Sequence, residues 1–232
     1  MFHFKFLSPV LCAVIAGFQP IISIAGPWED LLGAIKRDDT SAVTTLLLRG
    51  ADPNVEVLDQ GSLLTIAARE KAVGVSSMLL KLRQIDVNKT TKSGETAVML
   101  AAFNGDLELV KALVNRGADI NKPDWTPLHY AAASGQLSVV QYLVENNAYI
   151  DAESPNNTSP LMMAARHKHI TVMKWLVENG ADPTYTNGAG LNAASYMRRY
   201  GEVEQEAWLV SKSKEFEAKY GTKAKPKLAP VE

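Results

Sequence analysis

The sequence predicts an all-α solenoid of about six helix-pair repeats. The first observation is a polar residue that recurs at intervals of 34, 30, 33 and 33: Ser62, Thr96, Thr126, Ser159 and Asn192. The second is an Ala-Ala pair that follows four of these residues at a constant distance: 67–68, 101–102, 131–132 and 164–165. The third is a Gly-Ala-Asp sequence at 50–52, 117–119 and 180–182. Since independent markers keep one period, the chain is built from repeats.

The stretch 119–146 indicates how one repeat folds. Thr126 can cap free amide N–H groups at a helix start, and Pro127 suits the first helical position. Gly135 then separates this short helix from a second one with a single apolar stripe: Val139, Val140, Leu143 and Val144. Each repeat is therefore expected to be a helix, a tight turn and a second helix.

The period of about 33 residues, the Thr-Pro-Leu-His sequence at 126–129 and the Gly-Ala-Asp ends resemble ankyrin repeats. The resemblance covers about residues 28 to 200. It implies a stack of helix pairs whose hairpin-like loops project to one side. The residues favour the same arrangement, because one helix pair cannot cover its own apolar stripe and stacked pairs can.

The first 25 residues are predicted to be a secretory signal peptide. Lys5 precedes an apolar run at 9–18, and Ser23 and Ala25 place small residues where a signal peptidase cleaves, which predicts cleavage after Ala25. A transmembrane anchor is the alternative, but the run is short and Pro20 interrupts it. Cys12 is not preceded by the small residue that a lipidated cysteine requires. We therefore expect a periplasmic protein if the source is a Gram-negative bacterium, and a secreted one otherwise.

Cleavage would leave 23 Lys and Arg residues against 25 acidic ones, because Lys5 is the only charged residue removed. The weak net charge argues against nucleic acid as a partner. Cleavage would also remove Cys12, the only cysteine, which excludes disulfides and thiolate chemistry in the mature chain. Packing alone must then stabilise the fold.

The repeats are expected to occupy residues 26–201, with the first and last acting as caps. The second repeat should be the least regular, since it lacks a Gly or Asn at its end. The short interval before Thr126 predicts a notch in the row of loop tips, with Trp125 at its base. A capping helix is expected at 202–220, covering the stack through Val203, Ala207, Val210 and Trp208, and a disordered Lys/Pro-rich tail at 221–232.

No catalytic motif is present, so we expect no enzyme and no cofactor. His129, in the Thr-Pro-Leu-His sequence, is expected to hydrogen-bond neighbouring loops, as the resemblance implies. His167 and His169 form a His-x-His pair that could chelate a transition metal if other ligands converge. Without such ligands nearby in the sequence, we expect no metal. A metal-dependent hydrolase using this pair remains the least favoured function.

The resemblance implies that a partner protein binds the concave face, formed by loop tips and the exposed side of the first helices. Matched position by position, it selects these residues: Lys92, Ser93, Glu95, Phe103, Asn104, Trp125, Ser134, Asn156, Thr158, Arg166, His167, Arg199 and Tyr200. Aromatic residues and Arg are enriched among binding hot spots. Phe103 or Trp125 could instead pack against an adjacent loop. We expect a monomeric adaptor or chaperone-like partner of an exported enzyme, or alternatively an immunity protein that inhibits a delivered toxin.

Overall fold

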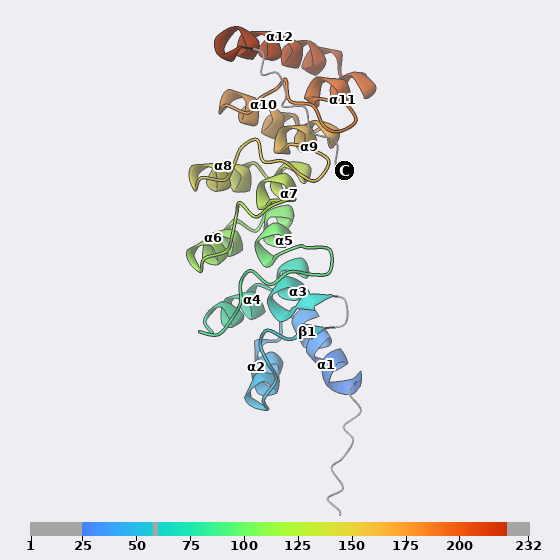
Figure 1. Cartoon of the computed structure of the whole chain (residues 1–232). Coiled ribbons are helices and arrows are strands. Elements are labelled where there is room, and N and C mark those ends of the chain that lie inside the picture. The colour runs from blue at the N-terminus through green and yellow to red at the C-terminus, as the bar shows by residue number, and fades with distance from the viewer. Residues whose placement is uncertain (1–24, 58–59, 222–232) are drawn as a thin grey trace, which may run out of the picture.

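The computed structural model describes residues 25–57 and 60–221 (Figure 1). The predicted signal peptide and tail lie outside the described residues, except for Ala25 and Gly221. The described residues form twelve helices and one short antiparallel hairpin, in which β1 (Glu56–Val57) pairs with β2 (Gly61–Ser62). The fold is therefore all-α, as the sequence predicts.

The helices form two columns, one from the first helix of each pair and one from the second (Figure 1). The first helices are α1 (Ala25–Lys36), α3 (Leu63–Arg69), α5 (Ala97–Asn104), α7 (Pro127–Ala133), α9 (Pro160–Arg166) and α11 (Ala193–Arg199). The second helices are α2 (Thr40–Leu48), α4 (Val73–Leu80), α6 (Leu107–Asn115), α8 (Leu137–Glu145), α10 (Ile170–Glu178) and α12 (Val203–Tyr220). The connections between repeats extend beyond the first helices (Figure 1).

A continuous apolar core runs between the two columns. The Ala-Ala pairs are completely buried in each of the four repeats that carry them. Small side chains at these positions let neighbouring first helices approach closely, while larger ones fill the layer beneath: Leu113, Leu143 and Leu176. Each helix pair thus buries its apolar stripe against its neighbours.

Asparagine side chains connect the loops of successive repeats. Asn88 donates from Nδ2 to the Gly117 carbonyl (3.1 Å) and accepts at Oδ1 from the Asp119 amide (2.8 Å). Asn54 and Asn121 make the equivalent pair of bonds one repeat before and after. An amide suits this position because it both donates and accepts. These bonds fix the spacing of the loops along the stack.

Left-handed residues end most of the second helices, as the sequence predicts. Gly50, Gly117, Asn147 and Gly180 all have positive φ. The second repeat differs, because α4 ends at Leu80 and none of the described residues from Lys81 to Ser93 has positive φ. That repeat is also the one preceded by the β1–β2 hairpin.

The last helix covers the stack with a different stripe from the one expected. Val203 is 73% exposed, and Ala207 and Val210 are exposed as well. The contact is made instead by Leu209, which is completely buried, and by Trp208, which packs against the core. Ser213 adds a bond from its hydroxyl to the Pro183 carbonyl (3.3 Å). The angle at which α12 docks decides which stripe faces the core, so only the Trp208 expectation is confirmed.

None of the helices in the described part of the chain is long and apolar enough to cross a membrane.

Candidate functional site

The candidate site is the surface formed by the last turns of the first helices, from α3 to α11. We call it the first-helix face; it is part of the surface that was predicted to be concave and to bind a partner. Five residues at the same position in successive repeats define its register: Arg69, Phe103, Ala133, Arg166 and Arg199. Ala133 is the smallest of the five, so the middle of this row is hollow.

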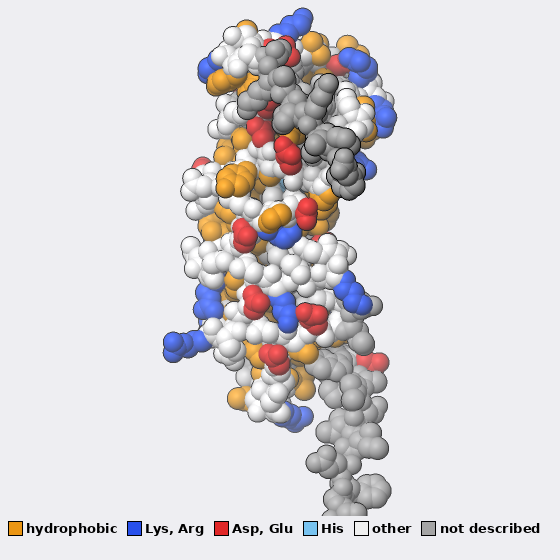
Figure 2. Space-filling view, viewed as in Figure 1, with side chains coloured by type: hydrophobic (Ala, Val, Ile, Leu, Met, Phe, Trp, Pro, Cys, Tyr) orange, Lys and Arg blue, Asp and Glu red, His pale blue; other side chains and the backbone are white. Residues whose placement is uncertain are grey.

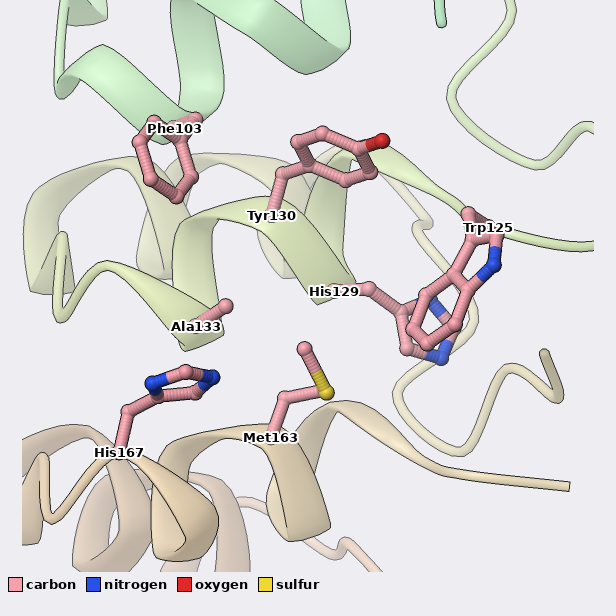
Figure 3. A pocket seen from close by; sticks show the side chains of 7 residues that line it. All are labelled: Phe103, Trp125, His129, Tyr130, Ala133, Met163 and His167. Carbon is pink, nitrogen blue, oxygen red and sulfur yellow. The ribbon is translucent and has the colours of Figure 1, made fainter. Parts of the chain in front are cut away.

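A cavity of about 340 Å³ opens at this point (Figure 3). Its walls come from three consecutive repeats and are mostly apolar. Phe103 and Tyr130 lie on one side of Ala133, and Met163 and His167 lie on the other (Figure 3). We call it the Ala133 pocket, lined by Phe103, Trp125, His129, Tyr130, Ala133, Met163 and His167.

Aromatic rings shape two walls of the Ala133 pocket. Phe103 meets Tyr130 edge to face, with ring centroids 6.3 Å apart, and Trp125 meets His129 in the same way at 5.3 Å. Such edge-to-face pairs are favourable and hold the rings in place. Phe103 nevertheless stays 50% exposed, and Trp125 is half-buried. Both therefore pack against neighbours and still offer apolar surface to solvent.

His129 fixes the floor of the pocket to the next repeat. Its Nδ1 accepts from the Thr126 amide (3.2 Å), so Nε2 carries the proton and donates to the Thr158 carbonyl (2.8 Å). Burial lowers the pKa of His129 to about 4, although the bond to Thr158 opposes the shift. The ring is therefore neutral at neutral pH, and the expectation that His129 bonds a neighbouring loop is confirmed.

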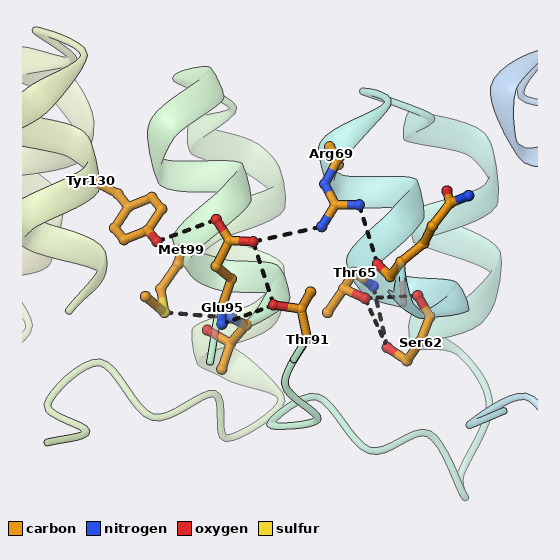
Figure 4. A network of polar contacts seen from close by, with 9 residues as sticks. Ser62, Thr65, Arg69, Thr91, Glu95, Met99 and Tyr130 are labelled. Atoms are coloured by element: carbon orange, nitrogen blue, oxygen red, sulfur yellow. Dashed lines mark hydrogen bonds and ion pairs between the residues drawn. The ribbon is translucent and has the colours of Figure 1, made fainter. Parts of the chain in front are cut away.

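A polar network centred on Glu95 lies beside the pocket (Figure 4). The Glu95 carboxylate accepts from the Tyr130 hydroxyl (3.3 Å) and forms an ion pair with Arg69 (3.6 Å). Burial, and then the negative charge of Glu95, raise the pKa of Tyr130 to about 12. A second cavity of about 250 Å³ is lined by this network and shares Phe103 and Tyr130 with the Ala133 pocket. The two hollows thus lie on either side of one aromatic pair.

The remaining predicted residues fall into two groups. Lys92, Ser93, Asn156, Arg166, His167, Arg199 and Tyr200 are exposed. Asn104 and Ser134 are half-buried and bond their own framework: Asn104 donates to the Ala68 carbonyl (2.9 Å), and Ser134 to the Tyr130 carbonyl (2.9 Å). These two residues mainly stabilise helix ends.

Thr158 corrects the predicted site. Its side chain is only 2% exposed, so it cannot contact a partner as expected. The Thr158 amide donates to Ser154 Oγ (2.9 Å), and its carbonyl accepts from His129. Thr158 belongs to the loop between α8 and α9, and its backbone is bonded within that loop and to α7.

Tyr130 and Met163 line the pocket but were absent from the predicted site. They occupy equivalent positions in α7 and α9, three residues before Ala133 and Arg166. Residues three apart on a helix lie on one face, so the repeat register contained this signal. Tyr130 and Met163 were not selected because large apolar side chains on a helix usually lie in the core.

His167 and His169 stack with their ring centroids 6.4 Å apart. His169 uses Nε2 in a bond with the Ala133 carbonyl (3.0 Å), and its ring lies against Gly135, where a Cβ would clash with Nδ1. Burial, Arg166 and His169 lower the pKa of His167, in that order. Among residues 25–57 and 60–221, no three His, Cys, Asp or Glu side chains are grouped so as to hold a metal ion.

The C-terminal part of the first-helix face carries unpaired positive charge. Arg69 is paired with Glu95, Lys168 with Glu202 (3.3 Å), and Arg198 with Glu206 (2.6 Å). Arg166 and Arg199 form no ion pair with any residue that the structure describes. Elsewhere, Figure 2 shows acidic and basic side chains interspersed over the viewed surface.

Comparison with known proteins agrees with this architecture. A family model described as ankyrin repeats (three copies) matches residues 31–124 and 121–187. The human ASB11 ankyrin repeat domain has a similar structure, with a TM-score of 0.70 and 26% sequence identity; the match covers 78% of this chain and 82% of that one.

Several curated proteins are similar over part of the chain. Human transient receptor potential cation channel subfamily A member 1 is 32% identical over 114 residues, which are 48% of this chain and 10% of the channel subunit. Protein phosphatase 1 regulatory subunit 27 from Mus musculus is 36% identical over 84 residues, 35% of this chain and 54% of that protein. Notch-regulated ankyrin repeat-containing protein A from Danio rerio is 41% identical over 69 residues, 28% of this chain and 62% of that protein.

The chain spans less than two thirds of the length of each of these relatives, so their similarity concerns the repeats alone. The family model, in contrast, matches well over half of this chain, and its matched residues are the helix pairs described above. The chain belongs to the ankyrin-repeat family, whose repeats are protein–protein interaction modules.

Proposed function

We propose that this protein binds another protein through its first-helix face, with the Ala133 pocket at the centre of the interface. The observation that carries this proposal is the pocket itself, an apolar hollow walled by partly exposed aromatic rings. Aromatic residues in well-packed pockets supply most of the binding energy in many interfaces. The protein acts as a non-enzymatic scaffold in this proposal.

Hydrogen bonds to neighbouring repeats hold the pocket in its shape. His129, at the floor of the pocket, is hydrogen-bonded to the Thr158 carbonyl. Asn121, in the loop before Trp125, is hydrogen-bonded to the next repeat. A surface ordered before binding loses little conformational entropy on association. The first-helix face is therefore suited to bind a partner without rearranging.

We place this activity outside the cytoplasm, as an adaptor or chaperone-like partner of an exported enzyme. Support comes from the sequence of residues 1–25, whose charged start, apolar run and small residues are typical of a signal peptide. N-terminal sequencing of the protein recovered from its native host tests this step. A mature chain beginning at Gly26 is expected, and a chain retaining Met1 in the cytoplasm would contradict it.

Crosslinked pull-downs from envelope extract test the binding face. The baits are the wild-type protein, Phe103→Ala and the matched control Tyr149→Ala. Tyr149 is 66% exposed on the loop after α8, away from the Ala133 pocket, so its loss removes an exposed aromatic ring elsewhere. The proposal expects a partner that wild type and Tyr149→Ala capture and Phe103→Ala does not. Equal capture by all three baits would show that the partner binds another surface.

A further inference from the structure

We propose that the Ala133 pocket takes one bulky apolar side chain from an extended segment of the partner, and that Arg166 and Arg199 bind acidic residues of the same segment. This inference rests on the proposed function and specifies its partner chemistry: a peptide segment with an apolar anchor and acidic residues on one side of it.

The position of the anchor follows from the register of the first-helix face. Every other residue in the row that Ala133 occupies is Arg or Phe, and each projects a long side chain from its helix end. Ala133 alone leaves a hollow, which Phe103 and Tyr130 border on one side and Met163 on the other (Figure 3). An incoming apolar side chain can enter the stack at this repeat, whereas the neighbouring cavity of about 250 Å³ is smaller and is bordered by the Arg69–Glu95 ion pair.

The chemistry of the anchor follows from the polar atoms around the pocket. His129 uses both ring nitrogens within the framework, and the Tyr130 hydroxyl donates to Glu95. His129 and Tyr130 thus have no hydrogen-bond donor left for a polar ligand, and although Trp125 and His167 add polar ring atoms, the lining of the pocket is mostly apolar. An apolar group would gain most from leaving water here, since burial of apolar area is the main favourable term available. A Leu, Met or Phe side chain suits a cavity of about 340 Å³.

The charge of the flanking residues follows from the ion pairs. On the N-terminal side of the pocket, Glu95 already neutralises Arg69. On the C-terminal side, Arg166 and Arg199 are exposed and form no ion pair with described residues. Arg166 and Arg199 are the last residues of their helices, where a positive charge interacts favourably with the helix dipole. This interaction leaves their guanidinium groups free to bind a carboxylate.

The repeat spacing sets the distance between anchor and acids. Neighbouring helices pack about 10 Å apart, and an extended peptide advances about 3.3 Å per residue. An acidic residue about three positions from the anchor would therefore reach Arg166, and one about six positions away would reach Arg199. The peptide can run in either direction along the face. In a given peptide the acidic residues therefore all precede the anchor or all follow it.

The first test selects peptides from a phage-displayed random library long enough to span three repeats, about ten residues. The bait is the purified protein, with Ala133→Phe as the counter-selection bait. Phe is the residue that the chain itself places at the equivalent position in α5, so the helix tolerates it. Peptides that prefer wild type are expected to share one bulky apolar residue with acidic residues about three and six positions away.

The second test measures the affinity of an enriched peptide by fluorescence anisotropy. Ala133→Phe should raise Kd by about tenfold or more, because it fills the anchor site. Arg166→Glu should raise Kd by about fivefold or more at low salt, and by less at high salt, because the contact is exposed and screened. The matched controls Tyr149→Ala and Arg49→Glu should change Kd by less than about twofold. Arg49 follows α2 directly and is exposed, so its reversal has a similar effect on the helix dipole.

Circular dichroism of each variant confirms that the fold is retained. Enriched peptides without acidic residues, or with basic ones, would overturn the inference, as would unchanged affinity in Ala133→Phe. If no peptide is enriched but the pull-down partner still depends on Phe103, the proposed function holds and this inference fails. If neither experiment detects binding at this face, both fail.

Discussion

His129 and His167 lie in successive repeats, and both line the Ala133 pocket, but their surroundings differ. His129 is completely buried and uses both ring nitrogens in hydrogen bonds to Thr126 and Thr158. His167 is exposed at the end of α9, and its ring only stacks on His169. One histidine belongs to the framework between repeats, and the other to the surface.

The difference separates stability from binding in this protein. Residues between repeats are closely packed and bonded to a neighbouring repeat, so their substitution should unfold the stack. Residues on the first-helix face are partly exposed, so their substitution should leave the fold intact and change only what it binds. The following predictions test this separation, from the largest expected effect to the smallest.

Leu128→Ala should lower the free energy of unfolding by about 4 kcal/mol, because Leu128 is completely buried and its loss leaves a cavity. Phe103→Ala, one repeat away on the first-helix face, should cost less than about 1 kcal/mol, because its ring is half exposed. Urea denaturation followed by circular dichroism measures both. Equal losses would show that the first-helix face also holds the stack together.

Acid should destabilise the protein through His129. Its pKa is about 4 in the folded state and 6.5 when unfolded, so below pH 6.5 the unfolded chain binds a proton that the folded chain does not. The stability that His129 contributes is thus complete above pH 6.5 and is lost as the pH falls toward 4. The shift corresponds to about 3 kcal/mol.

His129→Met is the matched variant for this pH dependence. The third repeat has Met99 at the equivalent position, and its sulfur accepts from the Thr96 amide (3.4 Å). The variant should therefore fold. Between pH 6.5 and 4 its free energy of unfolding should fall less steeply than that of the wild type, because the contribution of His129 is gone. Denaturation midpoints that fall equally with acid in both proteins would assign the pH dependence to other groups.

Lys71→Gly should raise the free energy of unfolding by about 1 kcal/mol. Lys71 has φ 58° at the turn after α3, whereas Gly105, Gly135 and Gly201 occupy the equivalent turns. Glycine adopts this conformation without the steric cost that a Cβ brings. Thermal denaturation detects the gain, and Glu70→Gly beside it, where φ is −80°, should destabilise instead.

Glu95→Gln should change stability by less than about 1 kcal/mol, because its ion pair with Arg69 is long and partly exposed. It should instead lower the pKa of Tyr130 from about 12, since it removes a nearby negative charge. The pKa should stay above its ordinary value, because burial is the larger cause. Absorbance titration, with Tyr130→Phe to identify the signal, measures the shift, and Glu108→Gln on α6 should leave it unchanged.

Local patterns in the sequence predicted the framework well. The Thr-Pro-Leu-His sequence identified the start of α7 and the structural role of His129, and Gly50, Gly117 and Gly180 identified helix ends. Each signal depends on residues within one turn of a helix, or on its repetition in the next repeat. The binding roles of the predicted surface residues stay predictions.

The site was predicted only in part. Phe103, Trp125 and His167 were expected on the binding face and do line one pocket. Thr158 was misplaced because its burial depends on a loop held by His129 from another repeat. Tyr130 and Met163 were missed because apolar residues on a first helix can face either the core or the surface, and only the packing of neighbouring helices decides which.

The sequence by itself determined the repeat period, the helix pairs and their caps, because these depend on contacts between residues close in the chain or one period apart. The tertiary structure decided the rest. It placed the side chains of three repeats around Ala133, and it turned α12 so that Leu209 and not Val203 covers the core. Both outcomes depend on the angles at which helices pack, and side-chain fit across the whole interface sets those angles.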